Sequence, residues 1–126
     1  MSQLKGKNVA VDAYCLLHKG AYTCARELVE GVETDKYVVF CMNRIDVLVR
    51  HGVVPYVVFD GGPLPNKKEE EESRAQGRRE QREKARRLWA EGSKAAAMEC
   101  YQRAVDITPE IANGLVQVCF FVFLIN

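Results

Sequence analysis

The stretch Val9-Ala10-Val11-Asp12 has a counterpart in Tyr56-Val57-Val58-Phe59-Asp60, and each is a short apolar run that ends in an aspartate. Runs of β-branched and aromatic residues of this length are typical of strands. Two helix-like segments, at roughly residues 14–30 and 35–50, lie between the two runs. A crossover of this length joins parallel strands, so the sequence predicts an α/β fold with both aspartates at one edge of a partial parallel sheet.

The carboxyl edge of a parallel sheet is where open α/β proteins place their ligands, and Asp12 and Asp60 therefore predict a site for a divalent cation. Hard cations such as Mg²⁺ take carboxylate oxygens as ligands. Taken singly, Asp12 is equally typical of a helix N-cap, and Asp60, which precedes two glycines, is typical of a turn. The pair at matching strand ends favours the metal site, although two acids make an incomplete one and the sequence offers no evident third.

Size and composition favour one small domain with an apolar core, since 48% of the 126 residues are hydrophobic. The five cysteines form no CxxC pair and no Cys/His cluster, which favours free thiols over disulfides or a zinc site. We expect no signal peptide, because the first residues are polar. We expect no membrane span either, because the apolar segment at residues 115–125 is shorter than the about 20 residues that a spanning helix needs.

Half of the 18 lysines and arginines lie between Lys67 and Arg87, where apolar residues are scarce. Four of them recur every four residues and so share one slowly rotating face of a predicted helix; we call them the arginine stripe: Arg74, Arg78, Arg82 and Arg86. Guanidinium groups in a row match phosphates, with Lys67 on nearly the same face, and they follow the second strand-end aspartate, where cations could reach a phosphate held by a metal. The alternative is an ordinary solvated helix with ion pairs, which the six acids in the segment support.

Tyr14 and His18 are four residues apart and share one face of the first predicted helix, just beyond Asp12. A phenol and an imidazole at the edge of a metal site can stack on a base or contact a phosphate. The alternative is that both are half-buried packing residues. Taken alone, the two residues favour the packing interpretation, and it is their position beside Asp12 that supports contact with a base or a phosphate.

Two further helices are predicted after a break at Gly92-Ser93. The first covers residues 94–107, and the second starts at Thr108-Pro109 with a cap and a first-turn proline. Residues 97–109 look like one helix of a tetratricopeptide unit, but such units need several copies to bury their faces. A noncatalytic scaffold is therefore the weaker interpretation.

Taken together, these motifs resemble the flap endonuclease and exonuclease 1 family, the XPG-type 5′ nucleases. The likeness extends from about Leu4 to Val118 and is nearer to the exonuclease members than to the flap-cutting ones. The matching segments are residues 7–14, 17–21, 40–43, 57–62, 64–68, 99–101 and 107–109.

The resemblance implies a PIN-like 5′ nuclease fold and a Mg²⁺-dependent 5′-to-3′ exonuclease on double-stranded DNA that also cuts 5′ flaps, with two Mg²⁺ ions in the complete family site. It implies that Asp12 and Asp60 are metal ligands and that Lys67 and Arg74 act on the scissile phosphate. Together with the stripe, it implies this DNA-binding set: Tyr14, His18, Lys67, Arg74, Arg78 and Arg82. Repair and recombination in the nucleus, with mismatch-repair proteins as partners, also follow from the resemblance.

The family's remaining acids lie in a later half, so residues 1–126 resemble an N-terminal fragment of the nuclease domain, for which we expect slight activity or none. Its expected parts are a strand-helix-helix-strand core (1–65), a basic helical arch segment (66–92), helices (93–118) and a divergent apolar tail (119–126). The alternative function is a noncatalytic DNA-binding or helical protein-interaction module.

Overall fold

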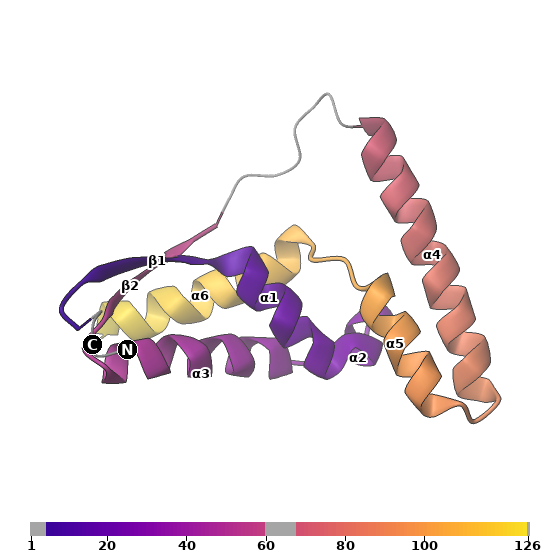
Figure 1. Cartoon of the computed structure of the whole chain (residues 1–126), viewed down its shortest axis with the longest axis horizontal. Helices are drawn as coiled ribbons and strands as arrows, with labels where there is room; N and C mark the ends of the chain where they lie inside the picture. The colour runs from indigo at the N-terminus through magenta and orange to yellow at the C-terminus, as the bar shows by residue number, and fades with distance from the viewer. Residues whose placement is uncertain (1–4, 60–67, 126) are drawn as a thin grey trace. The chain divides into compact units, whose positions relative to one another are not determined.

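The computed structural model describes residues 5–59 and 68–125. The chain is mostly helical with one small parallel sheet, which agrees with the predicted α/β class, and Figure 1 labels its elements. The described residues form two compact units, unit 1 with residues 5–20, 35–59 and 107–125, and unit 2 with residues 21–34 and 68–106. The elements follow in the order β1 (Asn8–Asp12), α1 (Ala13–Ala21), the 3₁₀ turn η2 (Tyr22–Cys24), α2 (Ala25–Val29), α3 (Lys36–Arg50), β2 (Val54–Val58), α4 (Lys68–Ala90), α5 (Lys94–Ala104) and α6 (Pro109–Ile125).

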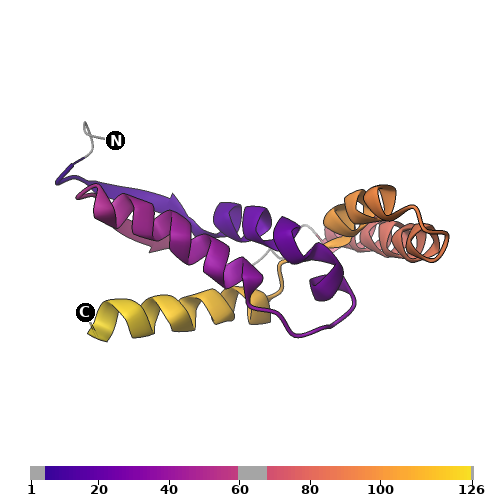
Figure 2. The ribbon, with the colours of Figure 1, turned by 90° about the horizontal axis from the view of Figure 1, so that it is seen from below.

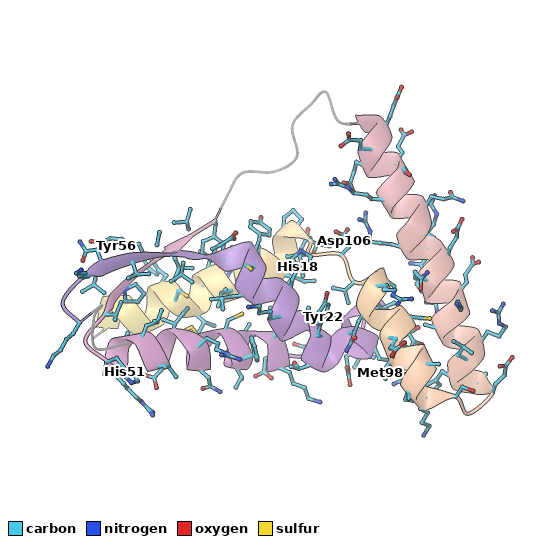
Figure 3. The ribbon with its side chains drawn as sticks, viewed as in Figure 1. His18, Tyr22, His51, Tyr56, Met98 and Asp106 are labelled. Carbon is cyan, nitrogen blue, oxygen red and sulfur yellow. The ribbon has the colours of Figure 1, made fainter. Side chains whose placement is uncertain are left out.

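The predicted parallel pairing is confirmed, because β1 and β2 pair in register from Asn8 opposite Val54 to Asp12 opposite Val58. Exposure alternates along both strands, as the two-residue period of a pleated strand requires. One face of the sheet is exposed, and Tyr56 on this face, labelled in Figure 3, is 56% exposed. The sheet thus brings the carboxyl ends of β1 and β2 to one edge.

The core of unit 1 lies on one side of α3, whose apolar spacing buries Tyr37, Val38, Cys41 and Ile45. This helix packs against β2 and against α6, and Figures 1 and 2 both show α3 and α6 side by side. Leu17 of α1 and Leu115 of α6 are fully buried in the same unit. Gly20 lets α1 approach α3, because a Cβ at this position would lie 2.8 Å from the carbonyl oxygen of Tyr37.

All five cysteines are free thiols, as predicted, and four of them are buried. Burial raises the pKa of the Cys41 thiol to about 11, and it also raises the pKa of the Cys119 thiol. The Sγ of Cys119 donates to the Sδ of Met42 at 3.7 Å. These thiols are packing residues and stay protonated at neutral pH.

The prediction of one continuous helix over residues 14–30 was wrong. The segment breaks into α1, η2 and α2, and Cys24 leaves the helical region with φ −140° and ψ 36°. The backbone carbonyl of Tyr22 accepts a hydrogen bond from Nε2 of Gln102 on α5, at 3.5 Å. Gly31, two residues after the end of α2, has a φ of +74°, a conformation that favours glycine.

In unit 2, α4 and α5 form an antiparallel helical hairpin, visible in Figures 1 and 2. The predicted break at residues 92–93 is present, and Gly92 makes the turn with a φ of +87°. Val105 is buried just after α5, and four residues are buried within this helix: Ala97, Cys100, Tyr101 and Ala104. Unit 2 therefore has its own small core, to which α2 contributes Ala25.

The predicted start of the last helix is confirmed, because Pro109 is the first residue of α6 and the Oγ1 of Thr108 accepts a hydrogen bond from the Ile111 amide at 3.3 Å. The helix continues to Ile125 through the segment expected as a divergent tail. Across residues 5–59 and 68–125, no helix combines the length and apolar character that a bilayer crossing requires.

Candidate metal-ligand position and nucleic-acid interface

Asp12 is the last residue of β1 and caps the helix that follows it. Its Oδ1 accepts hydrogen bonds from the backbone amides of Tyr14, at 3.0 Å, and Cys15, at 3.3 Å. The N-cap interpretation is therefore confirmed, and it leaves the other carboxylate oxygen, Oδ2, with no hydrogen bond to the described residues. An exposed carboxylate held in this way by helix amides has one oxygen free for a cation.

The other predicted ligand, Asp60, and the predicted phosphate-contacting residue Lys67 lie outside the described residues. Asp60 follows Val58, the partner of Asp12 in the sheet, by two positions in the sequence. Within residues 5–59 and 68–125, no three His, Cys, Asp or Glu side chains gather into a metal-binding group. The described part of this site is thus one carboxylate, Asp12.

Tyr14 and His18 lie on α1, where Tyr14 is half-buried and His18 is exposed. They are one turn apart on the helix that Asp12 caps, as the sequence predicted. His18 has no hydrogen bond or ion pair with the described residues, so its imidazole is free to contact a ligand.

The arginine stripe lies on α4, but its members have different surroundings. Arg74 is exposed and its guanidinium is 3.9 Å from Glu70, whereas Arg78 is only 23% exposed and binds Glu71 at 2.8 Å. The Nε of Arg82 is buried and has no hydrogen-bond partner in the described part of the chain. Arg86 makes two hydrogen bonds to Glu30, at 2.9 and 3.2 Å.

Arg86 is exposed, but its guanidinium is already bound within a cluster of side chains. The carboxylate of Glu30 also accepts a hydrogen bond from the hydroxyl of Tyr101, at 3.0 Å, and so links α2, α4 and α5. The Arg86 guanidinium lowers the pKa of Glu30, while burial raises the pKa of Tyr101. Nearby, the guanidinium carbon of Arg26 lies 4.2 Å from the ring centre of Trp89, in a cation–π contact that further joins α2 to α4.

Arg74 and Arg78 line a pocket of about 390 Å³ that is open to solvent; we call it the α4–α5 pocket. The remaining lining residues are Gly77, Glu80, Gln81, Arg103 and Val105. Gly77 leaves the middle of the α4 wall without a side chain, and a Cβ there would meet no atom within 4 Å. Three guanidinium groups and one carboxylate line this pocket, and guanidinium groups are suited to binding anions. Arg74 and Arg78 are also paired with Glu70 and Glu71.

Sequence reasoning missed Arg103, Gln81 and Gly77 as parts of this pocket. Arg103 lies on α5, and only the antiparallel packing of α5 on α4 brings it to Arg74 and Arg78. The four-residue spacing within α4 identified the stripe, but no spacing within one helix relates it to a residue on another.

Unit 1 thus presents an oriented carboxylate, Asp12, at the carboxyl end of a parallel strand, and unit 2 contains a pocket lined by three arginines. Residues 1–82 match the XPG N-terminal domain family, and the chain therefore belongs to this family of 5′ nucleases.

Individual relatives agree with this family. The chain is 50% identical to exonuclease 1 of Arabidopsis thaliana over 118 residues, which are 94% of this chain and 16% of that protein. It is 43% identical to exodeoxyribonuclease 1 of Schizosaccharomyces pombe over 116 residues, or 92% of this chain and 20% of that protein. It is 40% identical to the DNA damage-inducible protein DIN7 of Saccharomyces cerevisiae over 113 residues, or 90% of this chain and 26% of that protein. The chain thus spans 16–26% of the length of these three relatives.

Proposed function

We propose that this chain is the DNA-binding N-terminal part of a Mg²⁺-dependent 5′ nuclease with a PIN-like fold. Its substrate is double-stranded DNA with a 5′ end or a 5′ flap, and its place is DNA repair and recombination in the nucleus, with mismatch-repair proteins as partners. The observation that carries this proposal is the position of Asp12, at the carboxyl end of a strand paired in parallel with the strand that precedes Asp60. The relatives named exonuclease and exodeoxyribonuclease support the same reaction class.

The metal would be held by Asp12 and Asp60. Asp12 fits this role, because two helix amides orient its Oδ1 while its Oδ2 is unpaired. A bound Mg²⁺ activates water and stabilises charge on the leaving oxygen in phosphodiester hydrolysis. Asp12 itself presents an oriented carboxylate, and α1 supports that orientation through its first turn. Because two acids hold Mg²⁺ weakly, we propose slight or no turnover for the 126 residues by themselves.

DNA would be bound by Lys67, by Arg74, Arg78 and Arg82 of α4, and by Tyr14 and His18 of α1. Arginines provide planar, permanently charged donors for phosphate oxygens, and an exposed imidazole and a phenol ring suit an unpaired base or the terminal phosphate. The α4–α5 pocket also supports the second candidate, a noncatalytic DNA-binding module. The two candidates differ in metal dependence and share the DNA interface.

DNA binding is tested by the salt dependence of affinity. We expect the chain to bind a 5′-flap duplex at low salt and to lose affinity steeply as salt rises, because phosphate contacts release counterions. Arg74→Ala and Arg78→Ala should each weaken binding and reduce the slope of log K against log salt by about 0.7 to 0.9, the value of one phosphate contact. Fluorescence anisotropy measures both quantities.

The matched control for these variants is Arg50→Ala, which removes an exposed arginine that is likewise paired with an acid, Asp46 at 2.8 Å on α3. It changes the net charge equally and should leave the slope unchanged. A chain that binds no DNA at low salt would rule out both nucleic-acid functions, whereas salt-independent binding to a protein partner would favour the helical interaction module.

The metal role of Asp12 is separable from its capping role, because asparagine caps helices nearly as well as aspartate but carries no charge. In the absence of metal, Asp12→Asn should keep the melting temperature of the wild type, whereas Asp12→Ala should lose about 1 kcal/mol of stability with the cap. Added Mg²⁺ should raise the melting temperature of the wild type and of neither variant. Circular dichroism follows the transition.

An equal Mg²⁺ response of Asp12→Asn and the wild type would contradict the metal role of Asp12. In a nuclease assay, we expect little or no Mg²⁺-dependent release of nucleotides from a duplex with a blunt or recessed 5′ end. Robust digestion that Asp12→Ala abolishes would show instead that the 126 residues contain a working active site.

A further inference from the structure

The α4–α5 pocket contains arginines in two different states. Arg78 is held by two carboxylates of unit 2, since its Nη2 lies 2.8 Å from Oε1 of Glu71 and 3.8 Å from Oδ2 of Asp106. Arg103 on the opposite wall has no ion pair or hydrogen bond with any described residue. Among the described residues, Arg103 is therefore the unpaired arginine of the pocket, Arg78 is paired with two carboxylates, and Arg74 lies 3.9 Å from the carboxylate of Glu70.

The two carboxylates on Arg78 differ in how firmly they are held. Glu71 precedes Arg78 on α4 and makes a short hydrogen bond to it, whereas Asp106 lies between the end of α5 and the start of α6, as labelled in Figure 3, and is farther away. The side chain of Asp106 is 54% exposed, and exposed ion pairs contribute little stability. A phosphate can therefore displace Asp106 from Arg78 at small cost.

We propose that Asp106 is an internal competitor of DNA phosphate at Arg78 and thereby lowers the affinity of the α4–α5 pocket for the phosphodiester backbone. This inference rests on the proposed function, because it takes DNA as the ligand of the pocket. In the free protein, Asp106 and Glu71 together neutralise Arg78. A phosphate that enters the pocket binds Arg103 and Arg74 first, and it gains Arg78 only by displacing Asp106.

Two effects make Asp106 unfavourable for binding. Its charge competes for the Arg78 guanidinium, and it also repels an approaching phosphate, since like charges within a few ångström of each other interact even at a solvated surface. The consequence is selectivity: an isolated phosphate gains little in this pocket, whereas a DNA strand held by several contacts can replace the internal carboxylate.

The test measures the affinity of Asp106→Asn for a 5′-flap duplex by fluorescence anisotropy over a series of salt concentrations. We expect affinity at low salt to rise by up to about fivefold, the upper end for loss of one exposed ion pair. The salt slope should stay close to that of the wild type, because DNA displaces Asp106 in the wild type and Arg78 therefore contacts a phosphate in both complexes. The matched control is Asp46→Asn on α3, which removes the same charge from another exposed Arg–Asp pair and should leave affinity unchanged.

A second variant links the gain to Arg78. In an Arg78→Ala background, Asp106→Asn should give less than half of its gain in DNA affinity, because the guanidinium for which Asp106 competes is absent. The inference is overturned if Asp106→Asn binds no better than Asp46→Asn, or if its whole gain persists without Arg78. Trp89 fluorescence, which reports on unit 2, verifies that each variant is folded.

The proposed function can fail separately. If the wild type binds DNA and Arg74→Ala weakens that binding while Asp106→Asn changes nothing, only the competition is wrong. If neither the wild type nor Asp106→Asn binds DNA at low salt, the proposed function and the competition are both wrong.

Discussion

Replacing Tyr101 by alanine is expected to destabilise unit 2 by about 3–5 kcal/mol, the usual cost of removing a large buried aromatic side chain. Tyr101 is 2% exposed, and its ring meets that of Trp89 edge to face, with 6.4 Å between centroids and 73° between planes. Its hydroxyl donates to Glu30, which also binds Arg86. The substitution thus leaves a cavity between α4 and α5 and removes one of the links to α2.

Urea unfolding followed by fluorescence measures this loss, because Trp89 is the single tryptophan of the chain and lies in contact with Tyr101. Tyr101→Phe is the matched control, since it keeps the ring and removes the hydroxyl that donates a hydrogen bond to Glu30. It should cost only about 1 kcal/mol, the net value of one hydrogen bond. Equal losses for the alanine and phenylalanine variants would show that the hydroxyl, and not the buried ring, stabilises unit 2.

Gly20→Ala is expected to destabilise unit 1 by about 1–3 kcal/mol, although alanine is the better helix former. The added Cβ would lie 2.8 Å from the carbonyl oxygen and 3.2 Å from the Cα of Tyr37, both of them backbone atoms, and 3.3 Å from Cδ1 of Phe40. A backbone cannot move away as a flexible side chain can, so α1 would be displaced from α3. Because α1 carries Tyr14 and His18 and is capped by Asp12, the displacement would also disturb this end of the sheet.

The control for Gly20→Ala is Gly77→Ala, which adds the same methyl group to a glycine inside α4. No atom lies within 4 Å of the new Cβ at this position. This variant should gain about 1 kcal/mol from helix propensity alone. Thermal unfolding by circular dichroism and amide hydrogen exchange in α1 and α3 measure the two effects. Changes of the same sign in both variants would contradict the close approach of α1 to α3.

Several features of this protein are local and could be predicted from the sequence. Strand-length apolar runs separated by a helical crossover specified the parallel pair β1 and β2 and their common edge. Capping preferences located the start of α6 at Thr108-Pro109, and Gly92-Ser93 marked the break between α4 and α5. The resemblance to XPG-type nucleases likewise rested on residues close together in the sequence, and the family match agrees with it. The roles of Asp60 and Lys67 stay predictions.

What the sequence determined by itself is therefore the two paired strands and most of the helices, since these depend on periods of two and 3.6 residues along the chain. Only the tertiary structure decided how the arginine stripe is used: Arg86 binds Glu30, 56 positions away, while Arg78 binds Asp106 across the helical hairpin. It also decided that α1 ends near Gly20 and Ala21 and that Arg103 joins the α4–α5 pocket. The physical reason is that partners distant in sequence are selected by packing between helices, which no pattern within a single helix encodes.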